Sequence, residues 1–283
     1  MKNKSIVFLL LITAFFIACE EGFIKSPFSQ HWGVPEYDNS GASKSLNVAA
    51  VSFYVDISPQ KNLDKMVAFV DKIEIEQPNI RLILFPETIL GYYYKPSNPL
   101  EYQKSIAETI PGGTTNVISQ KAIEHDIYIS FGMVEKWGED LYNSQVLIGP
   151  TGSILSVHHK NHLVPWDKEN GFKAGNGITI NVIDNIKVAT IICYDGMFLD
   201  MYKEIHESGA ELLLLPIANT YNKTNLDLVP INYTSTWVLC ANRVGDEDGN
   251  NYDGWLYLST PSREPKIIIS GKEDYIYGVV KCR

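Results

Sequence analysis

Short runs of β-branched and aliphatic residues, each bounded by turn-forming residues, recur along most of the sequence, whereas stretches with helical periodicity are few. These runs predict strands at 47–55, 81–86, 127–135, 143–148, 154–160, 179–183, 187–193, 211–217, 237–243, 255–260, 266–270 and 275–280. Apolar residues at helical spacing predict helices at 62–76, 114–125 and 197–208. Many strands with few helices predict an α/β domain in which two sheets are each covered by helices on their outer faces.

The N-terminus has the pattern of an export signal. Lys2 and Lys4 precede an apolar run at 6–18, which is too short for an ordinary transmembrane helix. The run ends in Ala18-Cys19, as a bacterial lipobox does, although Phe16 stands where leucine is usual. We therefore expect Cys19 to be acylated. The alternative is an ordinary secretory signal whose cysteine is incidental.

This interpretation divides the chain into three parts. Residues 1–18 are expected to form the signal peptide, and residues 19–44, which are polar and lack apolar periodicity, a tether to the lipid anchor. Length alone would allow two small domains at 45–283, but the regular alternation of predicted strands and helices favours one. We accordingly predict an exported lipoprotein of a bacterial cell envelope.

Three polar residues each end a predicted strand. Glu87 follows the run at 81–86, Lys160 closes the run at 154–160, and Cys193 closes the run at 187–193. A thiol beside a helix N-terminus is expected to form a thiolate at low cost. A carboxylate, an ammonium and a thiol supply a base, an electrophilic clamp and a nucleophile. This set is suited to covalent acyl chemistry.

The segments around these residues resemble the nitrilase superfamily of carbon–nitrogen hydrolases, over a region from about Leu46 to the C-terminus. The matching segments are Phe85-Pro86-Glu87, Lys160-Asn161-His162-Leu163-Val164-Pro165, Cys193-Tyr194-Asp195, Gly209-Ala210-Glu211-Leu212-Leu213-Leu214-Leu215-Pro216 and Ala241-Asn242-Arg243-Val244-Gly245. The resemblance implies a four-layer α-β-β-α sandwich with a Glu-Lys-Cys triad at the ends of its core strands.

The resemblance also implies a role for each residue. Glu87 would take the thiol proton and later deliver it to the leaving amine. Lys160 and the backbone N–H of Tyr194 would stabilise the oxyanion. A second carboxylate of the family holds the lysine and places substrate or water; Glu169 fits best by its spacing, and Asp167 is the alternative. Glu135 is expected to be a solvated residue at a strand end.

The composition argues against several other kinds of site. A net charge of −9 gives no reason to expect nucleic-acid binding. His158, His159 and His162 lie close in sequence, but neighbouring strand residues point to opposite faces, so His158 and His159 are poorly placed to bind one ion. We expect no metal and no other cofactor.

Other features remain open. Tyr92, Tyr93 and Tyr94 either line the substrate entrance or pack on the surface, and Cys240 is expected to be a buried thiol rather than part of a disulfide with Cys282. Relatives usually carry an Arg-Ala-x-Glu segment where this chain has residues 229–235. Its absence puts the pocket shape and the family's usual homodimer in doubt.

The expected activity is hydrolysis of a small or exposed amide through a cysteine thioester. Tyr194-Asp195 follows the nucleophile, whereas true nitrilases usually have Trp-Glu there, so amides are predicted to be preferred over nitriles. The alternatives are N-acyl transfer from the same acyl-enzyme and a catalytically silent binding module on the same scaffold.

Overall fold

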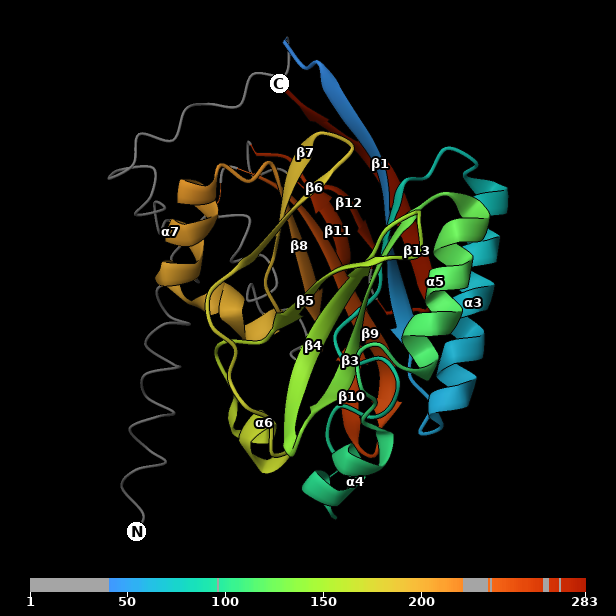
Figure 1. The fold of residues 1–283 in the computed structure, drawn as a ribbon, viewed down its shortest axis with the longest axis vertical. Coiled ribbons are helices and arrows are strands. Elements are labelled where there is room, and N and C mark those ends of the chain that lie inside the picture. The colour runs from blue at the N-terminus through green and yellow to red at the C-terminus, as the bar shows by residue number, and fades with distance from the viewer. Residues whose placement is uncertain (1–40, 96, 221–233, 235, 262–264, 270) are drawn as a thin grey trace. The chain divides into compact units, whose positions relative to one another are not determined.

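The computed structural model describes residues 41–95, 97–220, 234, 236–261, 265–269 and 271–283 (Figure 1). The predicted signal peptide, Cys19, nearly all of the tether, and the segment at 229–235 apart from Thr234 lie outside the described residues. Within the described ranges, no helix combines the length and apolarity needed to cross a bilayer.

The described strands form one hydrogen-bonded network that folds into two sheets. The strands are β1 (Lys44–Tyr54), β2 (Leu82–Leu84), β3 (Tyr128–Trp137), β4 (Asp140–Ile148), β5 (Ile154–His159), β6 (Thr179–Ile183), β7 (Ile186–Thr190), β8 (Leu212–Ile217), β9 (Trp237–Glu247), β10 (Asn250–Asp253), β11 (Leu256–Ser259), β12 (Pro265–Ile269) and β13 (Asp274–Cys282). The first sheet has the order β5-β4-β3-β2-β1-β13, and the second has β6-β7-β8-β9-β11-β12. β1 also pairs with β9, which connects the two sheets.

The alternation of side chains along the strands explains why two sheets form. In β1, Val48 and Ala50 join a cluster with Leu212 and Leu214 of β8, between the sheets. Ala49 and Val51, which point the other way, join the cluster beneath the helices of the first sheet. A strand that is apolar on both faces must be covered on both faces, so each central strand requires a helix layer outside and a second sheet inside.

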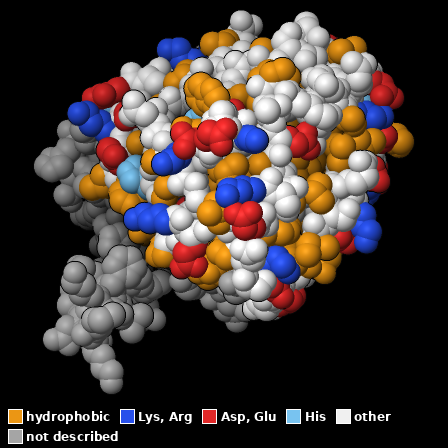
Figure 2. Space-filling model, turned by 60° about the horizontal axis from the view of Figure 1, so that its bottom comes forward, with side chains coloured by type: hydrophobic (Ala, Val, Ile, Leu, Met, Phe, Trp, Pro, Cys, Tyr) orange, Lys and Arg blue, Asp and Glu red, His pale blue; other side chains and the backbone are white. Residues whose placement is uncertain are grey.

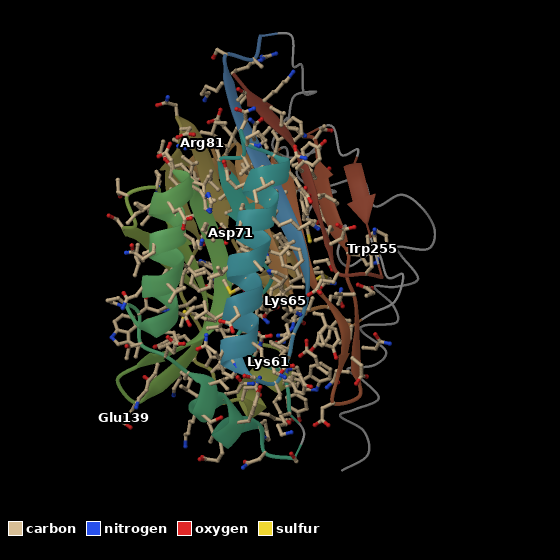
Figure 3. All side chains as sticks on the ribbon, turned by 90° about the vertical axis from the view of Figure 1, so that its right-hand side faces the viewer. Lys61, Lys65, Asp71, Arg81, Glu139 and Trp255 are labelled. Carbon is tan, nitrogen blue, oxygen red and sulfur yellow. The ribbon has the colours of Figure 1, made fainter. Side chains whose placement is uncertain are left out.

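The helices supply the two outer layers, as Figure 1 shows. α3 (Pro59–Glu76) and α5 (Gly113–His125) lie side by side over the first sheet, where Lys121 of α5 pairs with Asp71 of α3 at 2.8 Å (Figure 3). α7 (Leu199–Ser208) lies on the opposite side and buries Met201, Tyr202 and Ile205. The predicted four-layer α-β-β-α sandwich is therefore confirmed.

Some local structure differs from the sequence-based expectation. The helices α4 (Pro99–Ile106) and α6 (Pro165–Glu169) and the strand β10 were not predicted. α6 spans only five residues, and β10 has the polar sequence Asn-Asn-Tyr-Asp, so neither carries enough apolar periodicity to be recognised. The predicted helix at 197–208 is preceded by a 3₁₀ turn, Cys193–Met197.

The topology brings the ends of several strands to one edge of the sandwich. β2, β1, β9, β8 and β7 are parallel neighbours in that order, so all of them end at the same edge. β5 has the same direction as β3 because two antiparallel pairings separate them, and β3 is parallel to β2. The segments that follow β2, β5 and β7 therefore meet at this edge, which is at the bottom of Figure 1.

We predict that Gly132→Ala disturbs this edge. Gly132 lies in β3 against the turn that follows β2, and a Cβ there would lie 2.3 Å from the backbone nitrogen of Thr88 and 2.6 Å from the carbonyl oxygen of Pro86. Because both neighbours are backbone atoms, the turn must move, and we expect a loss of about 1–3 kcal/mol in the free energy of unfolding. Urea unfolding measures it.

Gly113→Ala is the matched control. A Cβ at Gly113 would meet its nearest neighbour, Oε2 of Glu108, at 3.5 Å, which is an ordinary contact. We expect this variant to keep or slightly raise the urea midpoint. Equal midpoints for Gly132→Ala and the wild type would show that the close approach at β3 does not constrain the turn.

Candidate active site

Glu87 lies in a sharp turn after β2. Its side chain is fully buried, and Thr88, the next residue, has a φ of +45°, in the left-handed region that non-glycine residues rarely adopt. Oε1 of Glu87 accepts hydrogen bonds from Nδ2 of Asn143 at 2.6 Å and from Nζ of Lys160 at 2.9 Å. Oε2 is buried and has no hydrogen-bonding partner among the described nitrogen and oxygen atoms. One carboxylate oxygen is thus held in place while the other is available to a proton.

Lys160 follows β5 and is fully buried. Its Nζ lies 2.8 Å from Oδ2 of Asp167, 2.9 Å from Oε1 of Glu87 and 3.2 Å from the hydroxyl of Tyr93. Burial alone would lower the pKa of Lys160, but the charges of Asp167 and Glu87 outweigh it and hold the pKa well above its usual value. Lys160 is therefore a permanently protonated cation inside the protein.

Cys193 begins the 3₁₀ turn Cys193–Met197, which Ile191 and Ile192 connect to the end of β7. Its φ of +47° lies in the left-handed region, which costs on the order of 1–3 kcal/mol for a non-glycine residue. Although Cys193 keeps partial solvent exposure, burial around the sulfur raises the pKa of the thiol well above its usual value. The charge of Glu87 raises the pKa further, and Lys160 opposes it only in part.

This result corrects the expectation of an easily formed thiolate at Cys193. The thiol is protonated at rest, because a sulfur anion would be poorly solvated and close to the Glu87 carboxylate. Thiolate formation must therefore accompany proton transfer to a base. Glu87, with its unpaired Oε2, is in position to be that base.

The second carboxylate on Lys160 is Asp167, whereas the sequence favoured Glu169. Asp167 is fully buried, and besides Lys160 its carboxylate accepts hydrogen bonds from the Tyr93 hydroxyl at 2.6 Å and the Val164 N–H at 3.0 Å. Glu169 is exposed and pairs with the hydroxyl of Tyr94. The short helix α6 is the reason, because it turns Asp167 inward and Glu169 outward.

Asp195 joins the cysteine turn to the segment after Lys160. Its carboxylate accepts hydrogen bonds from the backbone N–H groups of Ile192, Asn161 and His162 at 3.0, 3.1 and 2.7 Å. Burial would raise the pKa of Asp195, but the nearby imidazoles of His158, at 3.7 Å, and His162, at 3.2 Å, lower it to about 2. The fixed anion holds the nucleophile's turn against the lysine's loop.

His159, the third histidine of the cluster 158–162, points away from Asp195. Nε2 of His159 lies 2.6 Å from Oε2 of Glu135, which also accepts a hydrogen bond from Ser144 at 2.7 Å. Glu135 is buried, so the expectation of a solvated carboxylate at this strand end was wrong. The predicted separation of His158 and His159 onto opposite faces agrees with these contacts.

Arg243 of β9 is a buried residue that stabilises the turn after Glu87. Its guanidinium donates hydrogen bonds to the Gly91 carbonyl at 2.6 Å and the Thr88 hydroxyl at 3.0 Å, and both oxygens of Glu247 pair with it at 2.7 Å. Glu247 in turn accepts the N–H of Tyr93 at 3.1 Å. Burial raises the pKa of Glu247 to about 7, against the lowering effect of Arg243. This role of Arg243 was not predicted from the sequence.

The three consecutive tyrosines have different environments. Tyr93 is buried at Lys160 and Asp167, whereas the ring of Tyr94 stacks on Trp166 at 5.1 Å between centroids, on the exposed side of α6. Figure 2 shows the face over this edge, where acidic, basic and hydrophobic side chains are interspersed. Sequence spacing alone could not indicate which tyrosine points inward.

Tyr194 and the segment at 229–235 complete the set of predicted features. The Tyr194 ring is half-buried and meets Phe198 edge-on at 5.1 Å. Its backbone N–H adjoins the residue that carries the sulfur, and its role as an oxyanion donor stays a prediction. The segment at 229–235, apart from Thr234, lies outside the described part of the chain, as noted above.

Comparison with known proteins agrees with this geometry. Residues 47–272 match the family model for carbon–nitrogen hydrolases. A nitrilase from Pyrococcus abyssi is 29% identical over 231 residues, which cover 79% of this chain and 86% of that protein. A formamidase from Bacillus cereus is 27% identical over 207 residues, which cover 70% of this chain and 58% of the formamidase.

Solved structures show the same fold. An amidase from Nesterenkonia sp. has a TM-score of 0.73 at 19% identity, covering 84% of this chain and 90% of that one. A carbon–nitrogen hydrolase from Helicobacter pylori G27 also has a TM-score of 0.73, at 18% identity, covering 83% and 88%. The chain therefore belongs to the carbon–nitrogen hydrolase family of the nitrilase superfamily.

Proposed function

We propose that this enzyme hydrolyses small amides through a thioester on Cys193, with Glu87 as base and acid and Lys160 as the cationic oxyanion partner. The observation that carries this proposal is the difference between the two carboxylate oxygens of Glu87. Oε1 accepts hydrogen bonds from Lys160 and Asn143, whereas Oε2 is unpaired among the described nitrogen and oxygen atoms. A mutant of the Nesterenkonia amidase shows covalent addition of the acetamide moiety of fluoroacetamide at its active-site cysteine, which supports a nucleophilic cysteine in this fold.

The first half of the reaction acylates the cysteine. The thiol proton of Cys193 passes to Oε2 of Glu87 as sulfur attacks the amide carbon, and the carbonyl oxygen becomes an oxyanion. Lys160 and the Tyr194 N–H stabilise that oxyanion. Glu87 then gives the proton to the nitrogen, the C–N bond breaks, and ammonia or an amine leaves the thioester behind.

The second half releases the acid. Glu87 removes a proton from a water molecule that attacks the thioester carbon, and a second oxyanion forms at the same place. When the C–S bond breaks, the sulfur takes back the proton and the carboxylic acid is released. Because Asp167 and Glu87 both hold Lys160 protonated, the cation does not take part in these proton transfers.

The experiment that tests this function measures ammonia release from matched pairs of amide and nitrile. We expect each amide to be hydrolysed with a higher kcat/KM than its nitrile, and Cys193→Ala to lower kcat on the order of a million-fold, since it removes the only nucleophile. Intact-mass analysis should show an acyl adduct on the wild type. A nitrile that exceeds its own amide tenfold, about 1.4 kcal/mol in transition-state free energy, would exclude the amidase proposal.

Asp167 and Glu169 provide a matched pair of variants. Asp167→Asn removes one of the two charges that hold the Lys160 pKa high, so kcat should fall about tenfold or more, which corresponds to at least about 1.4 kcal/mol. Glu169→Gln alters an exposed carboxylate and should leave kcat within about twofold, as surface pairs contribute little. The pH–rate profile of each variant gives the readout. The opposite order of effects would assign the lysine-holding role to Glu169.

We also propose that the chain is exported and anchored through an acylated Cys19. The basic residues Lys2 and Lys4, the apolar run at 6–18 and the Ala18-Cys19 junction support this. Cys19→Ser is expected to move the protein from the membrane fraction to the soluble exported fraction, with unchanged amidase activity. Metabolic labelling with a fatty acid measures acylation of Cys19. If the wild type is not labelled, the lipid anchor is excluded and the N-terminus is an ordinary secretory signal.

A further inference from the structure

Tyr252 is a buried aromatic residue beside the catalytic groups. It lies on β10, where it pairs with Gly245 of β9, and only 1% of its surface is exposed. Its ring belongs to one apolar cluster with Tyr93 and Ala218. The guanidinium carbon of Arg243 lies 5.3 Å from the ring centroid, so a cation–π contact fixes the ring in place.

The neighbours of Tyr252 contact both sides of the reaction centre. Tyr93 touches Lys160 and Asp167 through its hydroxyl, and the backbone of Ala218 hydrogen-bonds the sulfur of Cys193. Burial raises the pKa of the Tyr252 hydroxyl well above its usual value, and the negative charges of Glu247 and Glu87 raise it further against the opposing effect of Arg243. The hydroxyl is therefore neutral.

The hydroxyl of Tyr252 is buried without a hydrogen-bonding partner among the described residues. Other tyrosine hydroxyls of this protein are paired: that of Tyr93 with Asp167 at 2.6 Å and that of Tyr128 with Asp184 at 3.2 Å. An unpaired buried hydroxyl is unfavourable, and phenylalanine would fill the same space without that cost. A hydroxyl at this position is explained if the substrate supplies its partner.

The arrangement of the triad indicates which part of the substrate would pair with the Tyr252 hydroxyl. The amide carbon must reach the sulfur of Cys193, its oxygen must face Lys160, and its nitrogen must face Oε2 of Glu87. The acyl chain is the part of the substrate that none of these groups occupies. We propose that the Tyr252 hydroxyl hydrogen-bonds to a polar atom on the second or third carbon of the acyl chain, so that the enzyme selects amides with a polar acyl group. This inference rests on the proposed amidase function.

The test uses two isosteric pairs of amides, butyramide with 3-hydroxypropanamide and isobutyramide with lactamide. In each pair a methyl group is exchanged for a hydroxyl at nearly constant shape. We expect the wild type to prefer the hydroxylated member of at least one pair about tenfold or more in kcat/KM. Tyr252→Phe should lower that preference about 10- to 100-fold, because the site loses the group that pairs with the substrate hydroxyl.

Tyr128→Phe is the control, since it removes a hydroxyl that is paired within the protein, at the other end of its strand from the active site. It should lower the unfolding midpoint and leave the preference within each pair unchanged. Tyr252→Phe should not lower the unfolding midpoint, because no protein hydrogen bond is lost.

The outcomes separate this inference from the proposed function. If the wild type hydrolyses none of the four amides and forms no acyl adduct, the proposed function fails. If it hydrolyses them and Tyr252→Phe leaves the preference within both pairs unchanged, the inference is overturned while the amidase function stands. A lowered unfolding midpoint for Tyr252→Phe would also overturn it, since the hydroxyl would then have a partner within the protein.

Discussion

The burial of Lys160 between two carboxylates is the interaction on which the active site depends. Removing an ammonium from water costs several kcal/mol even after relaxation, and a single partner rarely compensates it. Here Glu87 at 2.9 Å and Asp167 at 2.8 Å both face Nζ, and the Tyr93 hydroxyl provides a third contact at 3.2 Å. Burial of the sulfur, together with the negative charge of Glu87, is also what keeps the neighbouring thiol protonated. The same cluster therefore fixes the charge of the cation and the resting state of the nucleophile.

Backbone strain at this edge is balanced by contacts from outside the catalytic residues. Thr88 and Cys193 both have positive φ values, of +45° and +47°. The guanidinium of Arg243 donates hydrogen bonds to the carbonyl and hydroxyl oxygens of Thr88. Asp195 accepts a hydrogen bond from the backbone N–H of Ile192, the residue before Cys193. Such conformations persist only where the surroundings over-determine them. The buried Arg243 and Asp195 thus stabilise the two turns that carry the catalytic Glu87 and Cys193.

Strong strand periodicity allowed the α/β class to be predicted, and it placed Glu87, Lys160 and Cys193 at strand ends. The four-layer arrangement and the grouping of these three residues as one triad were implied by the resemblance to the nitrilase superfamily. The sequence did not allow Asp167 to be chosen over Glu169, since a single turn of helix decides which of the two points inward. The sequence indicated Arg243 only as part of a family-like segment, because the turn that it stabilises, at Thr88 and Gly91, is distant in sequence. Tyr252 escaped notice, as its polar strand resembles a loop until the pairing with β9 is known.

The two halves of the active site belong to different sheets. Glu87 and Lys160 follow strands of the first sheet, and Cys193 follows β7 of the second, so the interior between the sheets acts as a spacer that sets the distance from base to sulfur. Packed sheets lie about 10 Å apart, a value fixed by the side chains between them. Leu84 and Leu214 are among the residues that fill this gap. The volume of the apolar side chains between the sheets therefore contributes to the distance between the Glu87 carboxylate and the Cys193 sulfur. Substitutions in this interior can change the reaction rate although they lie outside the active site.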